Sequence, residues 1–348
     1  MYFKREELKK FKSLIGPLID VRSPSEYYKG HLPKSINIPL FDNEERAKVG
    51  TIYKRNGKEK AINEGLIIVE KKIKKLVDSL LNTIESHIKE NQKDNTTNQN
   101  IKIYCARGGM RSLSIGWLLE KYNFNIVTLK DGYKSYRKWA LNCFSKKWNI
   151  VILGGKTGTG KTKLLKLLSE NNYQTIDLEG FACHRGSTFG GLGMGEQPSN
   201  EHFENKISEK LNSFIKEYPV FVEAESANIG KCKIPNEFFN QMKTSPRIEL
   251  LRSEANRLDE LINTYSLYSQ EDLKEAVLRI KKRLGPQRTK IAIDSINEKK
   301  WDIVCKSVLE YYDKCYEYEK TGKENIKSLD LANLEYDKRI IALIEQLL

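Results

Sequence analysis

The sequence has few of the features that mark secreted, membrane-spanning or disulfide-rich proteins. Only six of its 348 residues are cysteine, and no two of them form a Cys-x-x-Cys pair, which argues against a zinc ribbon, a thioredoxin-type site or a disulfide framework. No apolar run approaches the length needed to cross a bilayer, and the first residues contain no apolar core of signal-peptide length. We therefore expect a cytoplasmic protein.

Negative charge is also in short supply relative to positive charge. The chain has 60 lysine and arginine residues against 46 aspartate and glutamate residues, a formal net charge of +14 and a pI near 9.2. Such an excess favours a polyanionic partner, RNA or DNA first, although a lysine-rich proteome would have the same effect. The basic cluster of Lys281, Lys282, Arg283, Arg288 and Lys290 is the candidate RNA contact, and a solvated helix face is the alternative.

A glycine-rich segment in the middle of the chain has the full spacing of a P-loop. It consists of Gly155, Lys156, Thr157, Gly158, Thr159, Gly160, Lys161 and Thr162. An apolar run precedes it and an amphipathic run follows, which predicts a strand, a phosphate-binding turn and a helix. The backbone N–H groups would surround phosphate oxygens, Lys161 would reach the terminal phosphate, and Thr162 would hold a magnesium ion. We expect a phosphate-bearing ligand, which need not be ATP.

An acidic strand end is the natural partner of this loop. Residues 220–222 are apolar and lead into Glu223 and Glu225. A P-loop fold places a carboxylate there, where it can position the magnesium ion of a diphosphate. A pair of solvated carboxylates at the end of a strand is the alternative interpretation. No tightly bound cofactor is expected beyond Mg²⁺ accompanying such a ligand.

A stretch rich in glycine, residues 179–197, predicts a long functional loop. His184 and Arg185 within it are candidates for contact with the ligand or substrate. Cys183 and His184 are adjacent in sequence, and adjacent side chains rarely chelate one metal ion together. We therefore predict no metal site at this pair.

Cys105 lies between a strand and a helix, in a turn that contains a glycine pair and two arginines. The N–H groups of such a turn converge on one point, and the helix dipole adds to their effect. Arg107 and Arg111 supply formal positive charge, so the surroundings favour the thiolate over the thiol and predict a nucleophile. A buried structural cysteine is the alternative.

The order of apolar runs predicts the fold class. Strands alternate with helices in two successive units, which indicates α/β architecture with parallel sheets. One helical stretch is expected at 64–89, and the pattern after residue 253 predicts helices to the end of the chain. We place a first domain at residues 1–145 and a P-loop domain with a helical C-terminal extension at residues 146–348.

The first domain resembles the rhodanese domain, whose loop cysteine carries sulfur or selenium. The resemblance rests on the segments Asp20-Val21-Arg22, Glu26-Tyr27, Gly30-His31-Leu32-Pro33, Asn37-Ile38-Pro39 and the Cys105 loop, in that order. It implies that Asp20 and Arg22 support the wall of the active site. Five residues separate Cys105 from Arg111, a spacing also seen in rhodanese-fold phosphatases, and a loop of that size makes a cradle wide enough for a tetrahedral phosphate.

A rhodanese unit ahead of a P-loop unit resembles the tRNA 2-selenouridine synthase family. The further matching segments are Asp177-Leu178-Glu179-Gly180, Cys183-His184-Arg185-Gly186-Ser187, Phe189-Gly190, Glu223-Ala224-Glu225-Ser226 and Arg283-Leu284-Gly285-Pro286-Gln287-Arg288-Thr289. The resemblance covers most of residues 18–290. One departure is Ala106, where the family commonly has a bulky aromatic residue.

What the resemblance implies is a transferase acting on the wobble 2-thiouridine of tRNA. The family geranylates the sulfur with geranyl diphosphate and then replaces it with selenium from selenophosphate. Cys105 would be the chalcogen carrier or nucleophile, and the P-loop would hold the diphosphate. Two other functions stay open at this point: a nucleotide-dependent kinase or switch with a regulatory rhodanese module, and a non-catalytic RNA-binding scaffold that accepts sulfur.

Overall fold

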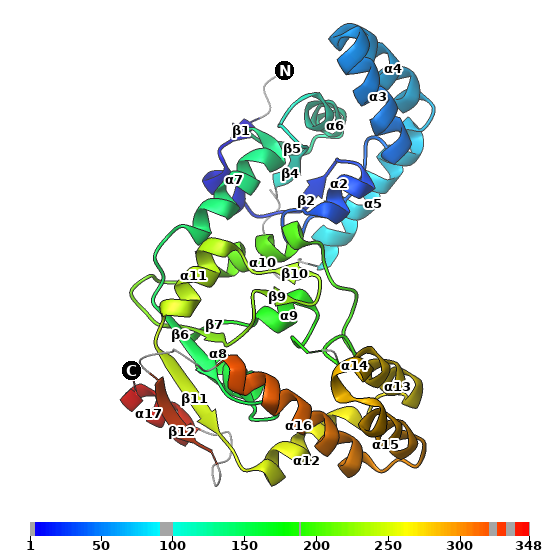
Figure 1. Ribbon diagram of the computed structural model, residues 1–348. Coiled ribbons are helices and arrows are strands. Elements are labelled where there is room, and N and C mark those ends of the chain that lie inside the picture. The colour runs from blue at the N-terminus through cyan, green and yellow to red at the C-terminus, as the bar shows by residue number, and fades with distance from the viewer. Residues whose placement is uncertain (1–3, 91–99, 188, 320–325, 332–337, 348) are drawn as a thin grey trace. The chain divides into compact units, whose positions relative to one another are not determined.

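The computed structural model describes residues 4–90, 100–187, 189–319, 326–331 and 338–347. The chain forms two compact units, Met1–Cys143 and Phe144–Leu348, and each contains one five-stranded parallel sheet (Figure 1). The α/β class with a helical C-terminal region, expected from the sequence, is confirmed. No helix in the described part of the chain is both long enough and apolar enough to cross a membrane.

The sheet of the first unit has the order β1-β5-β4-β2-β3. Its strands are β1 (Lys4–Glu6), β2 (Leu18–Asp20), β3 (Ile36–Asn37), β4 (Asn100–Tyr104) and β5 (Asn125–Leu129). All four strand pairings are parallel. The carboxyl ends of the central strands β2 and β4 therefore lie at the same edge, and this edge carries Asp20, Arg22 and Cys105.

Successive side chains of each strand point to opposite faces of this sheet, and helices cover both faces. They are α1 (Leu8–Ser13), α2 (Pro24–Lys29), α3 (Asn43–Asn56), α4 (Lys58–Glu70), α5 (Ile73–Glu90), α6 (Met110–Glu120) and α7 (Gly132–Phe144). Ile101 and Ile103 of β4 point into one core with residues of α5 and α6, whereas Tyr104 joins the opposite core with residues of α1 and α7.

The helical stretch expected at 64–89 is two helices, and it begins earlier than predicted. α4 ends at Glu70, α5 starts at Ile73, and α3 packs beside α4 as a further helix (Figure 1). The apolar spacing continues through residues 71–72, so periodicity alone did not reveal the interruption.

The sheet of the second unit has the order β12-β11-β6-β8-β7, again fully parallel. Its strands are β6 (Ile150–Gly154), β7 (Gln174–Ile176), β8 (Val220–Glu223), β11 (Arg247–Leu251) and β12 (Ile326–Asp330), with a separate hairpin of β9 (Asn228–Ile229) and β10 (Cys232–Lys233). The central strands β6 and β8 are neighbours, which brings the P-loop and the acidic strand end together.

Helices cover both faces of this sheet, and further helices form an additional layer. They are α8 (Lys161–Glu170), α9 (Leu178–Ala182), α10 (Asn200–Asn212), α11 (Asn236–Thr244), α12 (Glu254–Tyr265), α13 (Gln270–Arg279), α14 (Lys281–Leu284), α15 (Pro286–Asn297), α16 (Trp301–Glu319) and α17 (Lys338–Leu347). Ile150 and Ile152 of β6 pack with α10 and α11, while Val151 and Leu153 pack with α8 and α17. Helices α12 to α16 share a separate apolar core, which also includes Phe189 of the glycine-rich loop.

The expectation of helices from residue 253 to the end is wrong at β12. Residues Ile326–Asp330 form an edge strand parallel to β11, and within it only Leu329 is buried. An edge strand with one buried side chain carries no alternating apolar signal. The other edge strand, β1, is Lys-Arg-Glu with no buried side chain, and it was not expected at all.

Candidate functional site

Cys105 follows β4 directly and lies buried beneath its own loop. Its Sγ accepts a hydrogen bond from the backbone N–H of Gly109 at 3.3 Å and lies 3.3 Å from Ser112 Oγ. Ser112 Oγ is also 3.0 Å from the Gly109 carbonyl oxygen, which accepts its proton. Cys105 is 3% exposed, so these contacts hold the sulfur at the start of α6 and away from bulk water.

Helix α7 holds the same loop from the other side. The N–H groups of Tyr133 and Lys134 donate to the carbonyl oxygens of Cys105 and Ala106, at 2.8 and 3.0 Å. This close approach requires glycine at 132, because a Cβ there would lie 2.1 Å from the Cys105 carbonyl oxygen and φ is +56°. The conformation of the loop is thus fixed by two helices.

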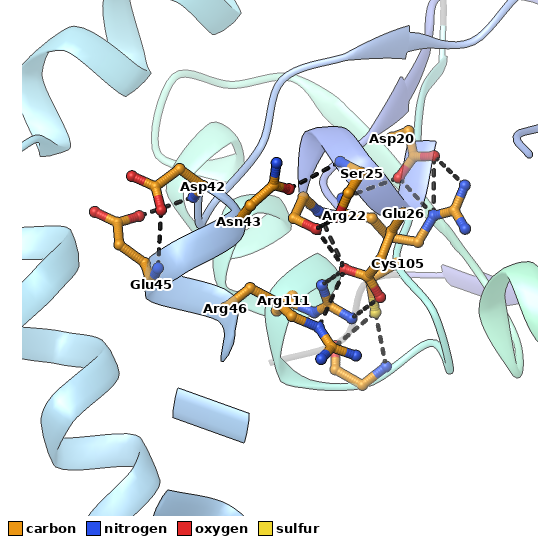
Figure 2. Close-up of polar contacts among 12 residues, drawn as sticks. Asp20, Arg22, Ser25, Glu26, Asp42, Asn43, Glu45, Arg46, Cys105 and Arg111 are labelled. Atoms are coloured by element: carbon orange, nitrogen blue, oxygen red, sulfur yellow. Dashed lines mark hydrogen bonds and ion pairs between the residues drawn. The ribbon is translucent and has the colours of Figure 1, made fainter. Parts of the chain in front are cut away.

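Arg111 is paired with Glu26 of α2 rather than standing alone (Figure 2). Its Nη1 and Nη2 donate to the two carboxylate oxygens at 2.6 and 3.2 Å. Partial burial favours the protonated acid, but the hydrogen bond and charge of Arg111 outweigh it and lower the pKa of Glu26 to about 2. Arg46 of α3 approaches the same carboxylate, with its Nε at 3.7 Å.

Asp20 and Arg22 form a buried pair at the end of β2. Arg22 donates to both carboxylate oxygens of Asp20, at 2.6 to 3.0 Å, and to the carbonyl oxygen of Gly30 at 2.7 Å. Its guanidinium also lies 3.9 Å from the ring centroid of Tyr133, the residue whose backbone N–H donates to the Cys105 carbonyl oxygen. The pair therefore connects the end of β2 with Gly30 and with α7, which also contacts the cysteine loop. Arg107 is exposed on that loop.

The predicted P-loop connects β6 to α8. Lys161 Nζ donates to the carbonyl oxygen of Gly155 at 2.8 Å, and Thr159 Oγ1 donates to that of Lys156 at 2.8 Å. Gly160, the residue before α8, has the left-handed conformation that lets the chain turn into the helix. The loop and its lysine thus surround the N-terminus of α8, where an anion is favoured.

The helical layer braces the tip of the P-loop. Arg257 of α12 donates from Nε to the Thr157 carbonyl oxygen at 2.8 Å and makes two bonds, of 3.0 and 2.5 Å, to Asp313 of α16. Lys156 Nζ reaches the same carboxylate at 3.2 Å. Gly158 is needed here, since its Cβ would lie 2.7 Å from the Arg257 carbonyl oxygen.

Three carboxylates meet beside the P-loop: Glu223 at the end of β8, Glu225 just after it, and Glu179 of α9. Each has an oxygen within 4.8 Å of the others. Burial raises the pKa of both Glu179 and Glu223 to about 8, the neighbouring carboxylates add to this effect, and the charge of Lys161 opposes it. The two acids are therefore harder to ionise than ordinary carboxyl groups, in spite of the nearby charge of Lys161.

The donor set fits a hard divalent cation. Glu223 is 1% exposed, and within the described residues its Oε1 has no hydrogen-bond partner. A Cβ at Gly186 would lie 2.6 Å from a Glu225 oxygen, so glycine keeps open the space beside the carboxylates. Oxygen-only donors of this kind suit Mg²⁺.

The glycine-rich loop places its two predicted residues in different surroundings. Arg185 donates to the Leu192 carbonyl oxygen at 2.9 Å and to Tyr268 Oη at 2.8 Å, so it ties the loop to the helical layer. His184 packs against Gly190, and burial, then the charge of Arg279, lowers its pKa. The loop also approaches the carboxylate cluster, because the backbone N–H of His184 donates to the Glu179 carbonyl oxygen at 3.0 Å.

Sequence reasoning gave no site role to four residues that complete these sites. They are Glu26, Glu179, Arg257 and Asp313. Glu26 and Glu179 were named only as parts of segments that carry the resemblance, and the partner of Glu26 lies 85 positions away. Arg257 and Asp313, 56 positions apart, are ordinary charged residues of two helices and gave no signal.

The chain is similar to known proteins along most of its length. The family model for the rhodanese-like domain matches residues 4–138, and that for the tRNA 2-selenouridine synthase AAA domain matches residues 148–330. The tRNA 2-selenouridine synthase of Sulfurovum sp. is 33% identical over 89% of this chain and 91% of its own length. That of Shewanella woodyi is 37% identical over 78% of this chain and 76% of its own length.

Among solved structures, one similar chain covers part of this chain. The N-terminal domain of a candidate ATP/GTP binding protein from Clostridium difficile 630 is 38% identical and covers 40% of this chain and 99% of that domain, with a TM-score of 0.35. The two domain matches and the long, full-length relatives decide the assignment. The chain belongs to the tRNA 2-selenouridine synthase family.

Proposed function

We propose that this protein converts the wobble 2-thiouridine of tRNA to 2-selenouridine through a geranylated intermediate. The uridine sulfur attacks the first carbon of geranyl diphosphate, a carbon–sulfur bond forms, and diphosphate leaves. The selenium of selenophosphate then bonds to the base carbon, and the geranylated sulfur leaves with its bonding electrons. Water attacks phosphorus, the selenium–phosphorus bond breaks, and inorganic phosphate is released. This proposal makes the enzyme a transferase with tRNA and two small phosphate-bearing donors as substrates.

The second unit suits the diphosphate step. The P-loop amides and Lys161 would bind the diphosphate, and Thr162 with the cluster of Glu179, Glu223 and Glu225 would hold Mg²⁺. When bound, the ion would neutralise the negative charge that grows on the leaving diphosphate. The chain's own part is to bind and orient the donor and to keep Lys161 directed at its phosphates.

The first unit suits the selenium step. Cys105 is the proposed carrier or nucleophile, because its sulfur accepts the Gly109 N–H and lies at the start of a helix. Arg107 and Arg111 are the proposed counter-charges of the anionic donor. Asp20 and Arg22 act as positioning residues through their contacts with Gly30 and Tyr133.

One observation carries the proposal. This member of the family combines a cysteine loop that two helices fix in place with a P-loop that lies beside a buried acidic cluster. The test is mass analysis of tRNA nucleosides after incubation with thiolated tRNA, geranyl diphosphate and selenophosphate. We expect 2-selenouridine with both donors, the geranylated nucleoside when selenophosphate is withheld, and no selenouridine from Cys105→Ser.

Two results would overturn the proposal. Nucleotide hydrolysis without RNA, and with no change in the nucleosides, would favour the kinase or switch alternative. Binding of tRNA with no product from either donor would favour a scaffold that only receives sulfur. A Cys105→Ser protein that forms selenouridine at the parent rate would remove Cys105 from its proposed role.

A further inference from the structure

The Cys105 loop contains a feature that selenium transfer does not require. Ser112 follows Arg111 directly, and its hydroxyl lies 3.3 Å from Cys105 Sγ and 3.0 Å from the Gly109 carbonyl oxygen. A hydroxyl has one proton, so rotation alone can move that proton from the carbonyl to the sulfur. A sulfur that departs as an anion would gain this hydrogen bond at the moment its bond breaks.

Arg111 has the shape and the spare donors to bind a phosphoryl group. A guanidinium has five N–H donors, and the two bonds to Glu26 leave three of them for a ligand. With the pKa of Glu26 lowered to about 2, the pair stays ionised at neutral pH and holds the guanidinium plane in place. A planar fork matches two oxygens of a tetrahedral phosphoryl group.

Helix α6 contributes further donors to the same place. It begins at Met110, its N-cap residue Gly109 has no capping side chain, and its first-turn N–H groups have no acceptor within the helix. Five residues separate the sulfur from Arg111, so the loop is wide enough for three phosphoryl oxygens. The nucleophile, the guanidinium fork and the hydroxyl therefore all belong to one loop and the first turn of the helix that follows it.

We propose that the first unit also transfers phosphoryl groups through Cys105. Its substrates would be monophosphoryl compounds whose leaving group departs as a stable anion, such as an aryl phosphate or a phosphoryl group bonded to selenium or sulfur. The Cys105 thiolate attacks phosphorus, a sulfur–phosphorus bond forms, and the leaving group departs with the electron pair. Water then attacks phosphorus, the sulfur–phosphorus bond breaks, and inorganic phosphate and a proton are released.

This inference rests on the proposed function only in taking Cys105 as the nucleophile. Its test uses the full chain and p-nitrophenyl phosphate, with the rate of p-nitrophenolate release and the intact mass of acid-quenched protein as readouts. We expect steady hydrolysis that is lost in Cys105→Ser. Arg111→Lys keeps the charge but loses the fork, and should lower the rate about 100-fold.

Ser112→Ala and Ser114→Ala make a matched pair on the same helix. Ser114 is exposed and donates to the Met110 carbonyl oxygen, away from the sulfur. Loss of the Ser112 hydroxyl should slow departure of the sulfur, so phosphorylated Cys105 should accumulate in Ser112→Ala. Ser114→Ala should behave like the parent and shows that the helix tolerates the change.

Several outcomes would overturn the inference. They are a parent rate no higher than that of Cys105→Ser, unchanged hydrolysis in Arg111→Lys, and phosphorylation at a residue other than Cys105. Formation of 2-selenouridine without hydrolysis would overturn this inference alone. Hydrolysis by a protein that forms no 2-selenouridine would instead overturn the proposed function and leave this inference standing.

Discussion

The substitution Gly132→Ala, which adds one methyl group, should abolish the function of the first unit while leaving the second unit intact. The Cβ of Gly132→Ala would lie 2.1 Å from the Cys105 carbonyl oxygen, whereas ordinary contact begins near 3.4 Å. Loop and helix must therefore separate by about 1.3 Å (3.4 − 2.1). The φ of +56° adds a strain of about 1–2 kcal/mol for any residue with a Cβ.

A displacement of that size would also move the Cys105 sulfur, because the sulfur and the displaced carbonyl group belong to the same residue. Misplacing a reacting group by about 1 Å costs about 100-fold in rate, so we expect 2-selenouridine formation to fall by about that factor. The rate is measured by nucleoside mass analysis, and geranyl diphosphate affinity is measured on the same preparation. The affinity should be unchanged, because the P-loop belongs to the other unit.

Gly50→Ala is the matched control in the same unit. Gly50 lies within α3 without a positive φ, and the nearest atom to its Cβ is Arg46 Nη1 at 3.7 Å. We expect the parent rate and a stability gain of about 0.5–1 kcal/mol from the better helix former. A Gly132→Ala protein that matched the parent rate would refute the reasoning, since it would show that the loop does not depend on this close approach.

Three other predictions concern the second unit. Lys161→Ala removes a charge-assisted hydrogen bond worth about 1.5–3 kcal/mol, so geranyl diphosphate affinity by calorimetry should fall at least about tenfold; unchanged affinity would place the diphosphate elsewhere. The pKa of Glu179 and of Glu223, about 8 against an ordinary 4.5, means that the folded chain holds extra protons and loses stability as pH rises through 8. Mg²⁺ should therefore raise the melting temperature more at about pH 9 than at about pH 6, and an equal effect at both would argue against the cluster as its site. Charge reversal at Lys282 and Arg283 should flatten the salt dependence of tRNA affinity by about 0.9 for each RNA phosphate that the variant no longer neutralises; an unaltered slope would put the RNA elsewhere.

The conformations of the two candidate loops were predictable because each loop is a contiguous run of residues. Lys161 and Cys105 lie in segments whose spacing, glycine content and flanking strand determine their local geometry. Both segments form the strand–turn–helix connections that were expected, at β6–α8 and β4–α6. Chemistry held within about ten neighbouring residues can be inferred from the sequence.

The residues that fix those loops were not predictable, since each depends on packing between distant segments. Arg111 was expected to face an anion directly, and the structure shows it held by Glu26, 85 positions away. Glu179 joins Glu223 only because β7 and β8 are neighbours in the sheet. The edge strands β1 and β12 were not predicted for a related reason, because they bury too few side chains to give a periodic apolar pattern.

The insertion of the helical layer between adjacent strands has a consequence for how the chain acquires its fold. Arg247 of β11 pairs with Ile326 of β12, so 79 further positions (326 − 247) must be synthesised before this pairing can form. During synthesis the edge of β11 stays unpaired until that late strand emerges, and such an edge is open to wrong partners. Asp313 also arrives late, so the P-loop turn exists for a time without its brace. In the nascent chain the Cys105 loop should therefore form first and the P-loop second. The contacts of Arg257 and Asp313 that brace the P-loop should form last.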